Sequence, residues 1–308
     1  MISGKTVLVT GATGLIGSAL VRRLREKGAK VTSAVRDPKR ADGDYVIYDA
    51  NAPIGFDIGF DCIVHAACSA HPMAYSTDPV GTMKANILGT MNLLEYAVKH
   101  YSRLLFISSG EIYGSDAPDE SGFRENHMGV LDTLNPRSCY PESKRAAETL
   151  VASYVKQYGA DALVARCCHV YGEGITKDNS RADAQFLRNA VSGSDIVMKS
   201  AGTQVRSFMY ADDCADALIT LLEKGEKGEA YNVAGRTVAS IADYARTLAQ
   251  LAGVKVVFED PDAVEKAGYT AVTRAVLDPS KLESLGFSAK YDLRSGLAET
   301  IKRWRTQN

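Results

Sequence analysis

The segment KTVLVTGATGLIGSALVRRLREKG, Lys5–Gly28, indicates the architecture of the chain. Its β-branched run Lys5–Thr10 predicts a buried strand. The apolar residues of Leu15–Lys27 recur at helical spacing, and Gly28 suits the end of a helix. Between strand and helix lies TGATGLIG, Thr10–Gly17. Glycines in such a turn let the backbone approach a phosphate group, and the free N–H groups of a helix N-terminus attract negative charge. The segment therefore predicts a strand, a phosphate-binding turn and a helix in succession.

Alternating strands and helices continue through the first half of the chain. Further strands are expected at Lys30–Val35, Tyr45–Tyr48, Asp61–His65, Arg103–Ser108 and Asp161–Arg166, and long helices at Pro79–His100 and Ser138–Tyr158. Because these strands are apolar on both faces and alternate with helices, they indicate a parallel sheet covered on both sides. The predicted fold class is α/β, with a doubly wound parallel sheet of the Rossmann type.

Three glycines spaced three residues apart give the first turn its expected role. Gly11 allows a tight turn, Gly14 lets the backbone approach a pyrophosphate, and Gly17 lets the helix pack close to the strand. A preceding strand and a following helix are the context in which such a motif binds a dinucleotide. A glycine-rich turn without a ligand is the alternative. The predicted phosphate-binding segment consists of Gly11, Thr13, Gly14, Leu15, Ile16 and Gly17.

The end of the second strand, Val35-Arg36-Asp37, bears on the choice between NAD and NADP. An acidic residue there would bind the ribose 2′-hydroxyl, whereas an arginine would accommodate a 2′-phosphate. The expected acidic position holds Val35, while Arg36 could face a 2′-phosphate and Asp37 could still turn toward a ribose. Both charged residues could equally be solvated residues of the turn. The sequence leaves NAD and NADP open.

After about residue 167 the elements become shorter and are separated by glycine and polar loops. They are expected at Ala182–Val191, Ile196–Lys199, Asp212–Glu223, Tyr231–Val233, Ile241–Leu251 and Arg294–Trp304. We predict a dinucleotide-binding domain over residues 1–167, to which a segment of about 205–236 returns. Residues 168–308 are expected to form mainly a smaller substrate-binding domain.

The composition is that of an ordinary globular protein. Of 308 residues, 45% are apolar and 24% are charged, and this length suits one sizeable domain with a smaller one. The net charge of −1 argues against nucleic acid or an anionic membrane as the main partner. No apolar run approaches the ~20 residues that span a bilayer.

The first residues and the cysteines favour a cytoplasmic protein. Met1–Lys5 leads directly into a strand and has no signal-peptide pattern. The cysteines have neither CxxC nor metal-ligand spacing, so no metal site is predicted, and free buried thiols in a reducing compartment are expected. The six cysteines are Cys62, Cys68, Cys139, Cys167, Cys168 and Cys214.

A tyrosine and a lysine four residues apart, Tyr140 and Lys144, form the predicted catalytic pair. They lie on one face of a helix, and an ammonium beside a phenol favours the phenolate and lowers its pKa. A phenolate can take a proton from an alcohol as a hydride leaves for a nicotinamide. Ser109 closes the fifth strand, at the edge where such sheets bind ligands, and could hydrogen-bond the same hydroxyl. A surface Tyr–Lys pair is the alternative.

These motifs resemble the extended branch of the short-chain dehydrogenase/reductase superfamily, and in particular its NAD-dependent epimerase/dehydratase family. The glycine spacing and the triad of Ser109, Tyr140 and Lys144 carry the resemblance. It implies that Asp49 contacts adenine and that the backbone at Ala66 passes under the dinucleotide. Beyond the phosphate-binding segment, the implied cofactor-binding residues are Arg36, Asp49, Ala66, Ala67, Asn86, Ser108, Tyr140 and Lys144.

Other segments narrow the resemblance to enzymes that modify nucleotide-linked sugars. Residues 106–114, FISSGEIYG, resemble the strand-end segment of nucleotide-sugar epimerases and dehydratases. Residues 206–213, RSFMYADD, resemble a segment whose arginine binds the substrate pyrophosphate, so Arg206 is implied to do so here. A planar guanidinium suits this task because it can hold two phosphate oxygens. Residues 282–287 and 293–304 resemble the C-terminal signature of the family.

Glu111 bears on the type of reaction. Sugar 4,6-dehydratases and UDP-glucuronate decarboxylases resemble this chain in carrying a glutamate two residues after the triad Ser/Thr, whereas simple 4-epimerases generally have a small residue there. A ketone at C4 acidifies C5, so the Glu111 carboxylate could move a C5 proton, and the same ketone would promote loss of a C5 carboxylate. A glutamate that only orders its loop is the alternative. Residues 67–75 and 135–140 also resemble the decarboxylases.

The chain departs from the family pattern at two places. Relatives usually have an asparagine where this chain has His169, and that residue normally helps to bind the diphosphate. His169 could do so as a donor, could mark a different substrate, or could be a core or loop histidine without a role. An arginine common in relatives is absent, and Glu173-Gly174 stands there instead. The sugar and the nucleotide therefore stay open.

The motifs allow three functions. In the leading hypothesis, Tyr140 takes the proton of a sugar 4-hydroxyl while NAD(P)+ takes the C4 hydride, and decarboxylation, dehydration or 4-epimerisation follows. The second is an NADPH-dependent reductase of a keto-sugar or another carbonyl, which Arg36 favours. The third is a dinucleotide sensor without catalysis, which would tend to lack the tyrosine or the lysine. The predicted catalytic residues are Ser109, Glu111, Tyr140 and Lys144, and the predicted substrate contacts are Ser109, His169 and Arg206.

The resemblance also implies a partner. Relatives pair the helices that correspond to Pro79–His100 and Ser138–Tyr158 into a four-helix bundle. A homodimer is therefore expected.

Overall fold

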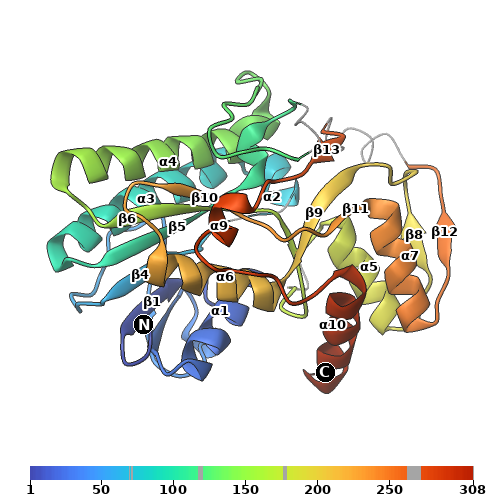
Figure 1. Cartoon of the computed structure of the whole chain (residues 1–308), viewed down its shortest axis with the longest axis horizontal. Helices are drawn as coiled ribbons and strands as arrows, with labels where there is room; N and C mark the ends of the chain where they lie inside the picture. Colours follow the sequence, from blue (N-terminus) through green and yellow to red (C-terminus); the bar gives the residue numbers. More distant parts are fainter. Residues whose placement is uncertain (69, 71, 117–120, 176–178, 262–271, 308) are drawn as a thin grey trace.

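The computed structural model describes residues 1–68, 70, 72–116, 121–175, 179–261 and 272–307, and the structural statements below concern this part of the chain. Its centre is a seven-stranded parallel sheet in the order β10-β6-β5-β4-β1-β2-β3 (Figure 1). The strands are β1 (Thr6–Thr10), β2 (Lys30–Val35), β3 (Tyr45–Ile47), β4 (Cys62–His65), β5 (Arg103–Ser109), β6 (Ala162–Cys167) and β10 (Ala230–Val233). The predicted α/β class with a doubly wound parallel sheet is confirmed.

The strand order reverses between β1 and β4. From β1 the chain proceeds outward to β2 and β3, and then returns to β4 on the other side of β1. Ligands of such sheets bind beyond the carboxyl ends of the strands at this reversal. The glycine turn follows β1, and Ser109 ends β5, so both lie at the same edge of the sheet.

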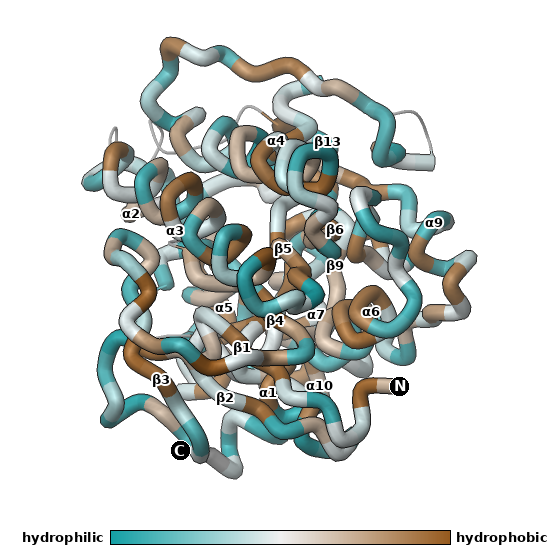
Figure 2. Tube along the Cα trace, turned by 90° about the vertical axis from the view of Figure 1, so that its left-hand side faces the viewer, coloured by the Kyte–Doolittle hydropathy of each residue, from teal (hydrophilic) through white to brown (hydrophobic). Residues whose placement is uncertain are grey.

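Helices cover both faces of the sheet. Helices α1 (Leu15–Glu26) and α6 (Ala211–Lys224) pack together over one face, and α3 (Pro79–His100) and α4 (Cys139–Tyr158) pack together over the other. Apolar strand residues such as Val9 and Phe106 are fully buried between these layers. Figure 2 shows that hydrophobic segments of β1, β4 and β5 lie in the interior.

A smaller lobe forms beside the carboxyl edge of the sheet. Its long central strand β9 pairs with the short strands around it, and its core is rich in aromatic side chains. Its strands are β7 (His169–Tyr171), β8 (Ile196–Met198), β9 (Val205–Tyr210), β11 (Val238–Ser240), β12 (Val256–Phe258) and β13 (Arg274–Ala275). Its helices are α5 (Ala182–Val191), α7 (Ile241–Ala252) and α10 (Leu293–Gln307).

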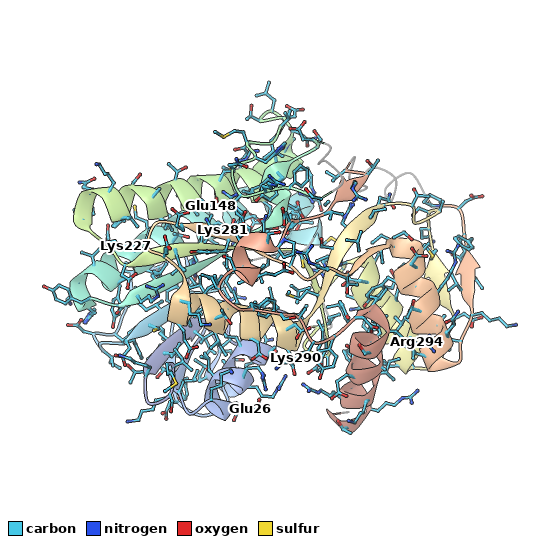
Figure 3. The ribbon with its side chains drawn as sticks, in the orientation of Figure 1. Glu26, Glu148, Lys227, Lys281, Lys290 and Arg294 are labelled. Atoms are coloured by element: carbon cyan, nitrogen blue, oxygen red, sulfur yellow. The ribbon has the colours of Figure 1, made fainter. Side chains whose placement is uncertain are left out.

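Short helices make several connections between these parts. They are α2 (Pro72–Thr77), α9 (Ser280–Glu283), and the 3-10 turns η1 (Pro38–Arg40), η2 (Gly110–Tyr113) and η3 (Pro136–Ser138). The Asp213 carboxylate on α6 accepts hydrogen bonds from the N–H groups of Lys290 and Tyr291, and so ties the segment before α10 to the main layer; Figure 3 labels Lys290. No helix in the described part of the chain is long and apolar enough to cross a membrane.

Most elements of the main sheet lie where the sequence predicts them, with ends that differ by a residue at most. Sequence reasoning missed the strands β7, β9, β11, β12 and β13 of the smaller lobe and the short helices α2 and α9. It missed β9 because the polar start of this strand hides the strand pattern. Strand β9 pairs in register with β7, far away in the sequence, so that His169 lies opposite Phe208. Such pairing has no local signal.

Candidate active site

The glycine turn brings two strand ends into close contact. Gly11 has a φ of +66°, and a Cβ built on it would lie 2.7 Å from the carbonyl carbon of Ala66. Only glycine permits both the conformation and this approach. A Cβ on Gly17 would collide with the carbonyl oxygen of Gly11. Gly17 therefore lets α1 pack against the preceding turn itself, whereas the sequence suggested packing against the strand.

The N-terminus of α1 has no side-chain cap, unlike those of α3 and α7. Asp78 caps α3 and Ser240 caps α7, but Gly14 at the start of α1 offers no side chain, and the first turn of α1 holds no acidic residue. Within the described residues, no acceptor is found for the N–H groups of Leu15 and Ile16. These N–H groups and the positive end of the helix dipole suit a ligand phosphate.

Thr10 fastens the glycine turn to β4. Its hydroxyl oxygen accepts hydrogen bonds from the N–H groups of Ala66 and Ala67, both at 3.1 Å, and lies 2.9 Å from Nδ1 of His65. Burial lowers the pKa of His65 to about 3, and the nearby charge of Lys144 acts in the same direction. The imidazole is therefore neutral near pH 7, and the Thr10 hydroxyl donates to Nδ1. Sequence reasoning did not identify this role of Thr10.

The predicted catalytic tyrosine and lysine are both buried at the start of α4. The Lys144 ammonium donates a hydrogen bond of 2.8 Å to the Ile107 carbonyl oxygen and lies 5.8 Å from the centre of the Tyr140 ring. Burial raises the pKa of Tyr140 well above its ordinary value, Cys68 and Glu111 raise it further, and a hydrogen bond with Ser109 opposes the rise. The structure thus brings Ser109, Tyr140 and Lys144 together. The expected lowering of the phenol pKa by Lys144 is not found; burial dominates instead.

Two neighbouring residues fix the backbone around Tyr140. Asn86 on α3 donates a hydrogen bond from Nδ2 to the Ser143 hydroxyl, and Ser143 donates to the carbonyl oxygen of Tyr140. Ser108 points to the opposite side from Ser109, and its hydroxyl donates to Glu148, which forms an ion pair with Arg166. Asn86 and Ser108 were predicted to bind cofactor, and this stays a prediction; the structure shows which protein groups hold their side chains.

A stack of three side chains lines the site beside Tyr140. The Tyr75 ring lies parallel to the Tyr140 ring, with centroids 4.7 Å apart, and the Arg137 guanidinium lies 4.7 Å from the centre of the Tyr75 ring. Arg137 also forms an ion pair with Glu111 at 2.9 Å. Glu111 is therefore joined through Arg137 and Tyr75 to Tyr140, the predicted catalytic tyrosine. Tyr75 and Arg137 were not selected from the sequence, although both lie in the segments that resemble the decarboxylases.

The predicted substrate contacts from the smaller lobe form a second group. Nε2 of His169 lies 3.2 Å from the Asp183 carboxylate, which also pairs with Arg181 at 2.8 Å. Burial lowers the pKa of His169, with Asp183 opposing this effect and Arg206 adding to it. Burial also lowers the pKa of Arg206, and Glu111 opposes it. Arg206 thus lies near both His169 and Glu111.

Arg206 itself is held by backbone carbonyl groups. Its guanidinium donates to the carbonyl oxygens of Val205 and Val272, both at 2.8 Å. Glu173, at the other departure from the family pattern, binds outside this group. It accepts a hydrogen bond from Tyr210 at 3.0 Å and pairs with Arg303 of α10 at 3.2 Å. Glu173 therefore links the lobe to its last helix.

The remaining predicted cofactor contacts lie at the edge of the sheet beside the glycine turn. Arg36 and Asp49 are both exposed, at the ends of β2 and β3. The Asp49 carboxylate accepts a hydrogen bond of 2.9 Å from the N–H of Asn51. A dinucleotide bound at this edge would extend from these residues past the glycine turn to Tyr140. The residues present fit such a cofactor. The glycine turn and the uncapped N–H groups of α1 follow β1, and the buried Tyr140 lies near Ser109 at the end of β5.

Comparison with known proteins agrees with this geometry. The model of the NAD dependent epimerase/dehydratase family matches residues 7–234. The chain is 32% identical to UDP-glucuronic acid decarboxylase 3 of Arabidopsis thaliana over 307 residues, which is 94% of this chain and 86% of the relative. It is 29% identical to UDP-glucuronic acid decarboxylase 1 of Xenopus tropicalis, over 98% of this chain and 73% of the relative.

Solved structures are similar over the whole chain. MoeE5, solved with UDP-glucuronic acid and NAD, is 26% identical with a TM-score of 0.83, covering 98% of this chain and 100% of that one. UDP-glucose 4-epimerase of Thermotoga maritima is 22% identical with a TM-score of 0.84, covering 98% and 99%, and shows the shared fold. The chain belongs to the NAD-dependent epimerase/dehydratase family and is an NAD(P)-binding enzyme of that family.

Proposed function

We propose that this enzyme oxidises C4 of a nucleotide-linked sugar and then acts at C5, with decarboxylation of a UDP-linked glucuronate as the best supported reaction. The observation that carries the proposal is the Glu111–Arg137 ion pair at 2.9 Å beside the Tyr75–Tyr140 stack. A carboxylate and a guanidinium are the groups needed to handle a C5 proton and a C5 carboxylate. The names of the similar decarboxylases and of the MoeE5 complex support the same substrate class.

The residues divide the work as follows. Tyr140 takes the proton of the 4-hydroxyl, and Ser109 holds the same oxygen through its hydroxyl. Bound NAD(P)+ supplies the acceptor for the C4 hydride. Burial raises the pKa of Tyr140, and the buried Lys144 charge is proposed to favour the phenolate during the reaction. Lys144 also keeps the helix against β5 through Ile107.

Chemistry at C5 falls to Glu111 and Arg137. In a decarboxylation, Arg137 binds the substrate carboxylate, and Glu111 positions the guanidinium through their ion pair. Loss of CO2 leaves the electron pair on an enolate of the C4 ketone, C5 then takes a proton from water, and the hydride returns to C4, so the reaction has no net redox change. In a dehydration, Glu111 would instead take the C5 proton. Arg206 and His169 are proposed to hold the diphosphate, since a guanidinium and an imidazole can donate to phosphate oxygens and the two side chains lie near each other. Net reduction of a carbonyl with NADPH is the second candidate, and the exposed Arg36 favours it.

Product analysis tests the proposal. Purified protein is incubated with UDP-glucuronate, UDP-glucose, and the dTDP-, GDP- and CDP-hexoses, each with NAD+ and with NADP+, and the products are read by mass spectrometry. Loss of CO2 from UDP-glucuronate is the expected result. Loss of water would make the enzyme a dehydratase, and an isomer of unchanged mass would remove the C5 role of Glu111. Consumption of NADPH in proportion to product would favour the reductase.

The division of labour between the two parts of the chain belongs to the same proposal. Residues 1–167, with a segment of about 205–236, bind the dinucleotide, and 168–308 mainly bind the sugar nucleotide. Support comes from α6 and β10, which follow residue 167 but pack with the main sheet.

The free cysteines, Cys62 and Cys214 among the buried ones, agree with a reducing compartment such as the cytoplasm.

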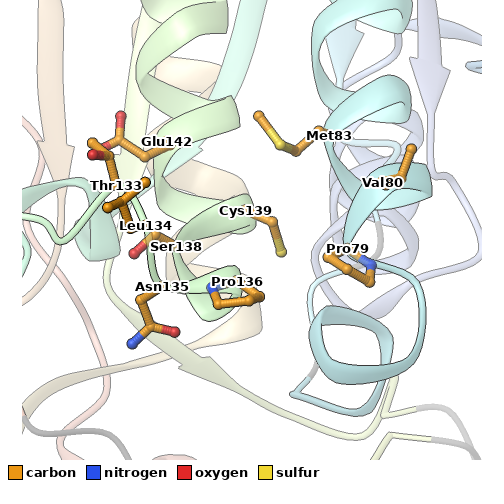
Figure 4. A pocket seen from close by; sticks show the side chains of 10 residues that line it. All are labelled: Pro79, Val80, Met83, Thr133, Leu134, Asn135, Pro136, Ser138, Cys139 and Glu142. Atoms are coloured by element: carbon orange, nitrogen blue, oxygen red, sulfur yellow. The ribbon is translucent and has the colours of Figure 1, made fainter.

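A homodimer through α3 and α4 is also proposed. A shallow pocket of about 170 Å³ lies between the starts of these helices, with Val80 and Met83 on one side and Leu134 and Cys139 on the other (Figure 4). Val80 is 63% exposed and Leu134 is 91% exposed, as expected of apolar residues that a second copy covers. Light scattering of the wild type and of Met83→Glu tests this: a dimer and a monomer are expected, and a monomeric wild type would contradict it.

A further inference from the structure

We propose that Asp183 is a positioning residue that holds the Nε2–H group of His169, so that His169 takes a proton from solvent at Nδ1 when the substrate diphosphate binds. The inference rests on the proposed function, because that function gives the diphosphate to His169 and Arg206. Asp183 acts through His169, and the bound proton makes the affinity for the sugar nucleotide depend on pH. The groups that face the two ring nitrogens of His169 support this assignment.

Asp183 is a fixed, buried carboxylate in the first turn of α5, with an exposed fraction of 3%. Arg181, at the N-cap of the same helix, binds both of its oxygens. Arg181 Nε donates to Oδ1 at 3.1 Å, and Nη2 donates to Oδ2 at 2.8 Å. Burial opposes ionisation of Asp183, but Arg181 and His169 hold its pKa below the ordinary value. Asp183 is therefore charged, and the two contacts with one guanidinium fix its orientation.

Nε2 of His169 faces this carboxylate. It lies 3.2 Å from Oδ1 of Asp183 and 3.3 Å from Nη2 of Arg181. Nη2 carries two hydrogens, and two shorter contacts use both of them, one with Asp183 at 2.8 Å and one with the carbonyl oxygen of Val170 at 2.9 Å. Arg181 has no hydrogen left on Nη2 for the imidazole. Nε2 of His169 therefore carries a hydrogen itself and donates it to Asp183.

The other ring nitrogen of His169, Nδ1, is left for a ligand. It has no hydrogen-bond partner among the residues that the structure describes, and 22% of the side chain is exposed. Burial lowers the pKa of His169, so the ring is neutral near pH 7 and Nδ1 is an acceptor. Diphosphate oxygens are acceptors too. A hydrogen bond between them requires a proton on Nδ1, and the negative charge of Asp183 favours that proton.

The charged groups around the imidazole come from α5, from the residue before it and from β9. Apart from burial, Asp183 raises the pKa of His169, whereas Arg181 and Arg206 lower it. Tyr244 of α7 lies near Asp183, and burial raises its pKa, so it stays neutral near pH 7. A bound diphosphate adds negative charge to this group, and it therefore raises the pKa of His169. Binding of the sugar nucleotide and uptake of the proton favour each other.

NMR tests the position of the hydrogen in the protein without a sugar nucleotide. The protein is labelled with ¹⁵N in its histidines, and His169→Asn identifies the signals of His169. Protonated Nε2 with unprotonated Nδ1 is expected near pH 7. The opposite tautomer would overturn the inference, because Asp183 would then hold no hydrogen of the ring.

Calorimetry tests the uptake of the proton. UDP-glucuronate, whose own charge is constant near neutral pH, is bound to Tyr140→Phe protein, in which turnover is suppressed, in two buffers that differ in ionisation enthalpy. Proton uptake is expected. The Kd should rise with pH, by up to about 10-fold per unit, between the pKa of His169 in the free protein, below about 6.5, and its higher pKa in the complex. Binding without proton uptake overturns the inference and leaves the proposed function intact, whereas no binding at all contradicts both.

Variants separate positioning from a structural role. Asp183→Asn is expected to abolish proton uptake and to weaken binding about 10-fold, as loss of a charge-assisted contact does. Because this variant also leaves Arg181 without its carboxylate partner, His169→Asn is the second variant, and its binding should be independent of pH. Asp183→Asn added to His169→Asn should weaken binding no further; a further loss would overturn the inference. His127→Asn is the matched control, since His127 pairs with Asp116 at 2.9 Å, and it should keep the proton uptake.

Discussion

The glycine turn and the side-chain cluster around Tyr140 are two proposed binding sites that are built in different ways. The turn presents backbone groups. It requires residues without a side chain, since a Cβ at Gly11 or Gly17 would collide with the neighbouring backbone. The cluster presents side chains from separate segments, with Tyr75, Arg137 and Tyr140 stacked together. A site made of backbone is encoded in a few consecutive residues. A site made of side chains exists only after distant segments fold together.

The largest effect is expected at Tyr140, the proposed catalytic residue. Tyr140→Phe removes the phenol oxygen and leaves the stacked ring, so turnover is expected to fall about 10²- to 10⁴-fold while dinucleotide affinity is kept. Steady-state rates and calorimetry measure the two quantities. Tyr158→Phe, at the exposed end of α4, is the control and should keep full activity. A loss of dinucleotide binding in Tyr140→Phe would mean that the two sites are not separable.

A smaller effect is expected at Glu111. Glu111→Gln keeps the size of the side chain but removes the charge that pairs with Arg137. Turnover is expected to fall roughly 10²-fold, at the low end for a proton-transfer or charge-positioning group, while reduction of bound NAD(P)+ on mixing with substrate still occurs. Stopped-flow absorbance of the reduced nicotinamide separates these steps. Unchanged turnover would show that Glu111 only orders its loop; Glu95→Gln on α3 is the matched control.

The backbone site has its own test in Gly17→Ala. The added methyl group meets the Gly11 carbonyl oxygen, so the turn must shift. Dinucleotide affinity should drop at least 10-fold, and the free energy of unfolding should fall by about 1–3 kcal/mol, as overpacking does. Gly55→Ala, where nothing lies within 4 Å of the new methyl group, should change neither. Normal affinity in Gly17→Ala would refute the close packing of this turn.

The last prediction concerns His65, which contacts Thr10 beside the glycine turn. The free energy of unfolding is expected to depend on pH through this residue. His65 has a folded pKa of about 3 because of burial, below the ~6.5 of an unfolded histidine. The unfolded chain therefore binds a proton more readily, and stability is lost as pH falls below about 6.5, by up to ~1.4 kcal/mol per pH unit. Denaturant melts at pH 7 and 5 measure this. His65→Gln should show a flatter pH profile, and an equally steep one would assign the effect to other groups.

The sequence predicted the features that consecutive residues encode, and it missed contacts between side chains from distant segments. The strand-turn-helix at residues 5–28 and the Tyr140–Lys144 pair are local patterns, and the sheet follows from apolar runs alternating with helices. Tyr75 and Arg137 lie in segments that resemble the decarboxylases, but the sequence does not show their contact, because it depends on α2 and η3 meeting beside α4. The pKa of Tyr140 was expected to fall beside Lys144. Burial instead dominates in the free protein, and burial is a property of the fold.

The buried ammonium of Lys144 has a consequence for the amount of enzyme in a cell. Its side chain is 2% exposed and bonds to one backbone carbonyl, and no carboxylate pairs with it in the described part of the chain. Removing such a charge from water is unfavourable, so ligand oxygen atoms that reach it stabilise the native state. A dinucleotide at 100 times its Kd adds about 2.7 kcal/mol to stability by mass action. Chains that lack dinucleotide unfold more often and meet proteases more often. Shortage of the cofactor would therefore lower the abundance of this enzyme as well as its rate.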